Sequence, residues 1–171
     1  MITAIYPGTY DPVTNGHVDV IGRASRIFDR VVVGVVGNPA HKQPMFTIEE
    51  RVEFLRVALG KLDNVEIDVF RELVVEFARK WDAKAIVKGL RVISDFEWEF
   101  QMNQLNRHLA PDVETVYVMA SPQVSFVSSS GVKEIAAFGG DVSALVPEPV
   151  AKRLAELFPN GRPGTPERPD E

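Results

Sequence analysis

The residues best suited to chemistry lie in one stretch near the start of the chain, YPGTYDPVTNGH, at residues 6–17. The stretch follows a short β-branched run and precedes a segment whose apolar residues have helical spacing. Thr9 and His17 supply a hydroxyl group and an imidazole, and Gly8 and Gly16 are expected to let the backbone approach a ligand closely. In an open parallel sheet, ligands bind beyond the carboxyl ends of strands, where helix N-termini attract anions. The stretch therefore predicts a site for a phosphate chain, with His17 in the first turn of a helix.

Two further stretches have the composition of phosphate-binding loops. KGLR at residues 88–91 is a basic run at the end of an expected strand, and VSFVSSS at residues 124–130 offers hydroxyl and amide groups before a helix. Each stretch also has a simpler interpretation on its own, as an ordinary loop, a turn with solvated charges, or routine serine capping. The common fingerprints GxGxxG and GxxxxGK[ST] are absent from the chain. A different design of phosphate site is needed.

The elements that must position these loops alternate along the chain. Short β-branched runs are separated by longer segments with apolar residues three and four positions apart, which is the pattern of an α/β fold. The expected strands are residues 2–6, 30–37, 64–70, 84–88 and 113–119. The expected helices are residues 16–28, 47–62, 73–81, 94–109, 129–138 and 148–157, and Thr47 with Glu50 has the pattern of a capping box. We predict a Rossmann-like, doubly wound sheet of five parallel strands with helices on both faces.

The composition of the 171 residues is that of one globular domain, which we expect to span residues 1–158. Hydrophobic residues make up 45% and charged residues 25%, and the absence of cysteine excludes disulfides, thiolate metal sites and a cysteine nucleophile. A net charge of −5 argues against binding to nucleic-acid backbones. We expect a cytoplasmic protein, because no export signal or membrane-spanning run is visible. Residues 159–171, rich in proline and glycine, are expected to be a disordered tail.

The expected helix at residues 94–109 carries bulky apolar side chains on more than one face. They are Phe96, Trp98, Phe100, Met102, Leu105 and Leu109. Phe96 and Phe100 lie off the stripe that the other four form, so a second contact surface is needed. That surface is either a second subunit or the interior of the same domain, and the pattern alone does not choose between them.

The motifs resemble those of one enzyme family. Thr14 to His17 matches the (H/T)xGH signature of nucleotidyltransferases, and the series YPGTYDPVTNGH, KQPMFTIEER, KGLR, DFEWE, NRHL and SFVSSS resembles the bacterial phosphopantetheine adenylyltransferases in order and spacing, over about residues 2–158. The resemblance implies that the terminal phosphate of 4′-phosphopantetheine attacks the α-phosphorus of ATP in line. The products would be dephospho-coenzyme A and pyrophosphate.

The resemblance also implies roles for individual residues. His17 would donate to the α-phosphate as negative charge builds in the transition state, with Thr9 and the backbone of Tyr10 beside it. The implied catalytic residues are His17, Thr9, Lys42 and Arg91. The implied ATP-binding residues are Thr9, Tyr10, His17, Gly89, Leu90, Arg91, Glu99, Val124, Ser125, Phe126, Val127, Ser128, Ser129 and Ser130. The implied acceptor-binding residues are Thr9, Lys42, Val74 and Lys88.

Several positions depart from the common pattern of that family. Lys88 stands where many members have arginine, so its contact with phosphate is expected to be monodentate. Val124 replaces a common aromatic residue and Gly131 a larger apolar one, which bears on adenine packing and loop rigidity. One extra residue in the loop after the second strand makes His41 a rival of Lys42. We choose Lys42 because a permanent cation suits a dianion better than an imidazole with a pKa of about 6.5.

The expected ligands follow from the same resemblance. They are ATP, 4′-phosphopantetheine, and dephospho-coenzyme A or coenzyme A as product or feedback ligands. The sequence has no cluster with the spacing of a protein metal site, so Mg²⁺ would be held mainly by ATP phosphates and water. A homo-hexamer is implied. Two alternatives stay open: a nucleotidyltransferase acting on a polyol phosphate or a mononucleotide, and a non-catalytic module that senses nucleotides.

Overall fold

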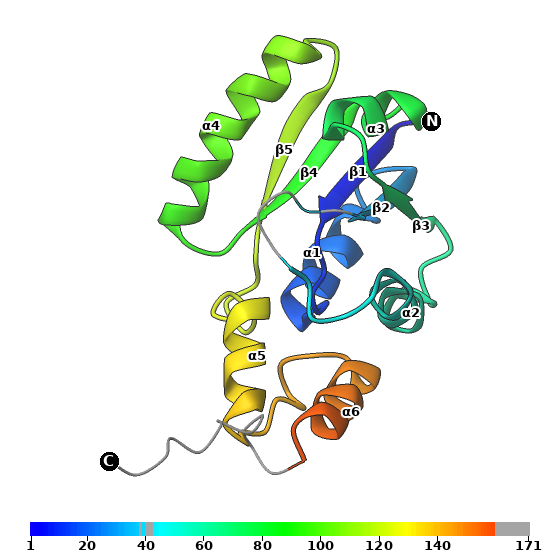
Figure 1. Cartoon of the computed structure of the whole chain (residues 1–171). Coiled ribbons are helices and arrows are strands. Elements are labelled where there is room, and N and C mark those ends of the chain that lie inside the picture. The colour runs from blue at the N-terminus through cyan, green and yellow to red at the C-terminus, as the bar shows by residue number, and fades with distance from the viewer. Residues whose placement is uncertain (38, 40–42, 160–171) are drawn as a thin grey trace.

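The computed structural model describes residues 1–37, 39 and 43–159. The elements in chain order are β1 (Thr3–Gly8), α1 (Asn15–Ala24), β2 (Arg30–Val36), α2 (Ile48–Leu59), β3 (Val65–Phe70), α3 (Val74–Lys80), β4 (Ala85–Leu90), α4 (Ile93–Leu109), β5 (Glu114–Met119), α5 (Ser129–Ala137) and α6 (Glu148–Leu157). The strands pair in parallel in the order β3-β2-β1-β4-β5 (Figure 1). The predicted five-stranded parallel α/β fold is confirmed.

Both faces of the sheet are covered, because successive side chains of a strand enter different cores. Ala4 and Tyr6 of β1 belong to a large buried cluster with residues of α1, α2, α5 and α6. Ile5, between them, belongs to a second cluster with residues of α3. Burial on both faces explains why the strands read as continuous apolar runs.

The strand order places a crevice beside β1. The chain runs outward from β1 through β2 to β3 and then returns to the other side of β1 with β4 (Figure 1). Loops that leave β1 and β4 at their carboxyl ends therefore turn to opposite sides, which is the switch point where open α/β sheets bind ligands.

Two strands reach further toward this crevice than the sequence predicted. β1 continues through Gly8, which is in register with Val35 of β2. β4 continues through Leu90, which is in register with Met119 of β5. Our expectation that the strand ends at Lys88 was therefore wrong for Gly89 and Leu90, because pairing with β5 keeps the backbone extended to Leu90.

The helix α4 finds little cover within the chain. It lies along the outer side of the sheet near β5, and Asn106 is its buried residue (Figure 1). The exposed apolar residues on it are Ile93, Phe96, Trp98, Phe100, Leu105 and Leu109. The alternative of a helix buried within its own domain is therefore wrong for the single chain.

None of the helices in the described ranges is long and apolar enough to cross a membrane. The predicted disordered tail falls outside the described residues from residue 160 onward.

Candidate active site

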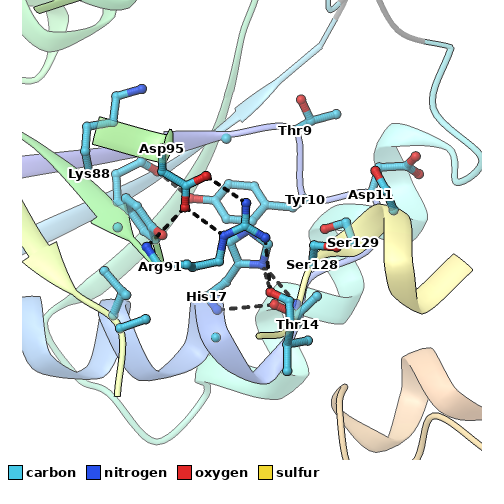
Figure 2. Close-up of a pocket in the computed structure, with 18 of the residues that line it drawn as sticks. Thr9, Tyr10, Asp11, Thr14, His17, Lys88, Arg91, Asp95, Ser128 and Ser129 are labelled. Carbon is cyan, nitrogen blue, oxygen red and sulfur yellow. Dashed lines mark hydrogen bonds and ion pairs between the residues drawn. The ribbon is translucent and has the colours of Figure 1, made fainter. Parts of the chain in front are cut away.

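A cavity of about 880 Å³ lies at the carboxyl ends of β1 and β4. Its lining comes from the β1–α1 loop, the end of β4 with the start of α4, and the start of α5 (Figure 2). The predicted site residues that line it are Thr9, Tyr10, His17, Lys88, Gly89, Arg91, Glu99, Val127, Ser128, Ser129 and Ser130. The fold thus brings the three candidate loops to one place.

The first turn of α1 builds its own cap from the TNGH motif. The Thr14 hydroxyl accepts a hydrogen bond from the His17 amide at 3.4 Å, and His17 Nδ1 accepts one from the Thr14 amide at 3.0 Å (Figure 2). A backbone N–H can only donate, so Nδ1 carries no proton and the hydrogen of the neutral ring lies on Nε2. The motif therefore assigns the tautomer of His17 as well as starting the helix.

The surroundings of His17 keep its ring neutral. Burial, followed by the positive charge of Arg91, lowers the pKa of His17 to about 4. The N-terminal end of the helix dipole also disfavours a cation at this position. At neutral pH His17 therefore presents an uncharged Nε2–H donor and has no ring nitrogen free to accept a proton.

Tyr10 packs over Gly8, which lies two residues before it. Its φ of 52° is in the left-handed region, and its buried hydroxyl donates to the carbonyl of Tyr6 at 2.6 Å. The Tyr10 ring meets the His17 ring edge-on at 5.2 Å between centroids. A Cβ atom on Gly8 would lie 2.9 Å from Cζ of Tyr10. Gly8 is therefore needed for the packing of Tyr10. It also lines the cavity, and its role in close approach of a ligand stays a prediction.

Arg91 is held by a carboxylate one helical turn further on. Its Nε and Nη2 donate to the two carboxylate oxygens of Asp95, each at 3.1 Å, and its amide donates to Asp95 as well (Figure 2). Burial of Asp95 opposes its ionisation, but the hydrogen bonds from Arg91 outweigh this and lower its pKa. The guanidinium plane is thereby set at the edge of the cavity, with Nη1 3.4 Å from the Val127 carbonyl.

Lys88 also meets a carboxylate from α4. Its Nζ lies 3.2 Å from Glu99 Oε2, and both side chains are about one-fifth exposed. The sequence placed Lys88 at an acceptor phosphate and Glu99 at the nucleotide. The structure joins the two residues directly within the same cavity, and their roles toward the ligands stay predictions.

The serines before α5 fill two roles. The Ser128 hydroxyl accepts from the Gly131 amide at 3.0 Å and caps α5, while the Ser129 hydroxyl donates to the Pro12 carbonyl at 2.8 Å. The second bond ties this loop to the β1–α1 loop. The serine-capping interpretation is therefore correct for Ser128. Both Ser128 and Ser129 also line the cavity.

Five predicted site residues lie away from the cavity lining, and one lies outside the described residues. Those away from the lining are Leu90, Val74, Val124, Ser125 and Phe126. Leu90 is buried within β4, Val74 and Val124 pack against the two cores, and Phe126 is 71% exposed. Lys42, like its rival His41, belongs to the residues that the structure does not describe.

The sequence reasoning missed residues that organise the site. Asp11 accepts from the amides of Met45 and Phe46 at 3.0 and 2.9 Å, and pairs with Lys133 of α5 at 2.6 Å. Burial opposes ionisation of Asp11, but these contacts, with Lys133 first, lower its pKa. Asp11 lies inside the recognised motif, and Asp95 lies four residues after Arg91, so spacing could have indicated both.

Trp98 also lines the cavity, although its side chain is 66% exposed. No group of three His, Asp or Glu side chains in the described part of the chain is arranged to hold a metal ion.

Comparison with known proteins finds relatives across the whole domain. Residues 5–135 match the model of the cytidylyltransferase-like family. A phosphopantetheine adenylyltransferase of Caldanaerobacter subterraneus subsp. tengcongensis is 53% identical over 158 residues, covering 92% of this chain and 98% of the relative. One of Desulforudis audaxviator is 50% identical, covering 92% and 96%. A solved structure titled as a putative nicotinate-nucleotide adenylyltransferase from Vibrio parahaemolyticus has a TM-score of 0.66 at 17% identity, covering 92% and 93%, and so shares the fold.

Proposed function

Since this chain belongs to the phosphopantetheine adenylyltransferases within the cytidylyltransferase-like family, we propose that it transfers the adenylyl group of ATP to 4′-phosphopantetheine. The products are dephospho-coenzyme A and pyrophosphate. The observation that carries the proposal in the structure is the neutral Nε2–H donor of His17 at a helix N-terminus, in a cavity that also holds Arg91 and Lys88. Such a site can bind phosphates and stabilise charge without transferring a proton.

The chemistry fits a direct displacement. A phosphate monoester is largely dianionic near neutral pH and attacks without a general base. An oxygen of the acceptor phosphate forms a bond to the α-phosphorus of ATP, and the bond from that phosphorus to the β-phosphate bridge breaks. His17 donates to the α-phosphate as charge accumulates there, and removing such a donor costs about 10² to 10³ in kcat.

The remaining roles divide along the cavity. Arg91 and the loop from Ser128 to Ser130 bind the triphosphate, and Lys88 binds the acceptor phosphate. These roles are supported by the position of all five residues in the lining of the same cavity. Glu99 holds Lys88 until the acceptor arrives, because its carboxylate lies 3.2 Å from the ammonium group. Lys42 and Val74 keep their roles at the acceptor as predictions from sequence.

Mg²⁺ enters with the substrate as MgATP. This ion prefers phosphate oxygens and water, and it commonly keeps several waters when it binds nucleotides. Coenzyme A shares the adenylyl and pantetheine parts of the product, so it is a feedback ligand of the same cavity.

The assembly is a homo-hexamer that covers α4. In support of this, six bulky apolar residues of α4 are exposed in the single chain. Monomeric soluble proteins rarely expose large apolar patches, so a second subunit is the natural partner of α4.

The proposal is tested by measuring pyrophosphate release with ATP or CTP and a panel of acceptors. 4′-Phosphopantetheine with ATP is expected to be the best pair, and His17→Ala is expected to reduce kcat about 10²-fold or more. His108→Ala is the matched control, since this exposed histidine of α4 is outside the cavity. No pyrophosphate from 4′-phosphopantetheine and ATP would overturn the proposal. A polyol phosphate or mononucleotide as the better acceptor would favour the other nucleotidyltransferases, and ATP binding without turnover would favour a sensor.

A further inference from the structure

Arg51 is a charged side chain buried beneath the site. It lies in the first turns of α2, is 1% exposed, and heads the largest fully buried side chains of the protein. No carboxylate of the described residues forms an ion pair with it within 4.0 Å. Buried charges are normally paired, because removal from water is costly. Asp11 and Glu49 attract Arg51 without such a direct contact, so the burial of this guanidinium needs a reason.

The guanidinium bonds to backbone carbonyls at the point where two strands part. Nη1 donates to the carbonyls of Thr9 at 2.8 Å and Val36 at 3.0 Å, and Nε donates to Thr47 at 3.4 Å. The last register pair of β1 and β2 is Gly8 with Val35. Arg51 therefore joins Thr9, which follows β1, to Val36, the last residue of β2. It takes the place of the strand pairing that ends one residue earlier.

The bond to Thr9 acts on the site through one peptide group. The carbonyl of Thr9 and the N–H of Tyr10 belong to the same planar trans unit and point in opposite directions. A cation held at the carbonyl therefore orients the Tyr10 N–H away from Arg51. Thr9 and Tyr10 line the cavity, whereas Arg51 does not.

The Tyr10 amide has no hydrogen-bond acceptor among the described residues, in contrast to the amides of Asn15 and His17 further along the loop. A positive charge on the carbonyl end of a peptide also polarises its N–H and strengthens the bond that this group donates. An oriented, polarised and unpaired N–H in a phosphate cavity is a ready donor to an oxyanion.

We propose that Arg51 is a positioning residue for nucleotidyl transfer, which holds the Thr9–Tyr10 peptide so that the Tyr10 amide donates to the phosphate undergoing attack. The inference rests on the proposed function. It extends that function by adding a buried cation that acts through the backbone and never touches the ligand.

Two substitutions separate the charge of Arg51 from its geometry. Arg51→Met keeps the length of the side chain and removes all donors, and it is expected to lower kcat about 10²-fold, as small misplacements of reacting groups do. The KM for 4′-phosphopantetheine is expected to change less than threefold, because the hydrogen bond from the Tyr10 amide to the phosphate strengthens in the transition state. Arg51→Lys keeps the cation, but its shorter side chain falls short of the Nη1 position that donates to both Thr9 and Val36 and also loses the Nε bond to Thr47, so it is expected to lower kcat about tenfold.

Arg56→Met is the matched control on the same helix, because Arg56 is 68% exposed and, within the described part of the chain, forms an ion pair with Glu53 alone. Kinetics are compared at a temperature where circular dichroism reports each variant fully folded. A folded Arg51→Met or Arg51→Lys enzyme with a kcat within threefold of Arg56→Met overturns the proposal. A merely structural Arg51 would lower the Tm and leave kcat per folded molecule unchanged.

A measurement on the unaltered protein is independent of turnover and of variant folding. The amide signal of Tyr10 in an NMR spectrum is expected to move downfield when MgATP is added, as a hydrogen bond to phosphate forms. A Tyr10 amide that does not respond to bound MgATP overturns the role of Arg51. Failure of the proposed function is a different result: MgATP moves the amide, but 4′-phosphopantetheine yields no pyrophosphate.

Discussion

The protonation of His17 gives the sharpest test of the site. The structure places the pKa of this residue at about 4, below the ordinary 6.5, because the ring is buried and faces the charge of Arg91. At pH 7 about one molecule in 10³ then carries an imidazolium at this position. The perturbation to apply is pH, with His17→Gln as the reference that cannot titrate. Glutamine at this position preserves the capping box with Thr14, because its carbonyl oxygen can accept from the Thr14 amide.

The size of the expected change in unfolding free energy follows from the linkage between folding and proton binding. Between pH 6.5 and 4 the unfolded chain binds a proton at His17 that the folded chain excludes, so the free energy of unfolding falls as the pH drops through this window. The gap between the two pKa values corresponds to about 3 kcal/mol at most. This contribution is fully present above pH 6.5 and lost near pH 4. The His17→Gln variant has no group that titrates at this position, so the unfolding free energy of the wild type should fall relative to that of the variant toward acid pH.

Two assays read this out. Urea unfolding at several pH values gives the difference in unfolding free energy, and the ring signals of His17 in NMR spectra give its pKa directly. In addition, kcat is measured from pH 7 to pH 9, where the acceptor phosphate stays dianionic. A neutral donor leaves kcat level across this range, whereas an imidazolium donor with a pKa near 6.5 would make it fall about tenfold per pH unit. An NMR pKa above 6, or an alkaline fall in kcat that His17→Gln abolishes, would refute the reasoning.

Three further predictions follow from named contacts. Gly8→Ala is expected to lower kcat at least about tenfold, because the new Cβ lies 2.9 Å from the Tyr10 ring, while Gly22→Ala, with open space around it, leaves pyrophosphate release unchanged. Asp95→Asn is expected to lower kcat/KM for ATP about fivefold, since an amide nitrogen then faces one arm of the Arg91 fork and about 1 kcal/mol is lost; an unchanged kcat/KM would show that Asp95 does not orient Arg91. Leu105→Glu, at an exposed apolar position of α4, is expected to dissociate the assembly into smaller species in light scattering. If the unaltered protein itself has the mass of a monomer, the proposed hexamer is refuted.

The sequence alone was enough to predict the local features of the chain, which are its strands, helices and helix caps. Apolar spacing predicted the strands and helices, and the capping box of Thr47 and Glu50 is present, with bonds of 3.0 and 3.2 Å. The TNGH motif was assigned to the start of a helix, where Thr14 and His17 indeed cap α1. These features depend on residues within one or two turns of each other, so the order of residue types contains the necessary information.

Contacts between distant segments were decided by the tertiary structure alone. Pairing with β5 draws Gly89 and Leu90 into β4, and the carboxylate of Glu99 reaches Lys88 because α4 folds back beside the site. The neutrality of His17 requires burial and the charge of Arg91, which lies 74 positions further along the chain. Arg51 looks like any basic residue of an amphipathic helix until α2 places it against the carbonyls of Thr9 and Val36. Residue types and spacing thus determined which groups the site contains, and only the packing of β1, β2, α2 and β4 decided their charge states and partners, because burial and long-range Coulomb interactions depend on neighbours that sequence order does not specify.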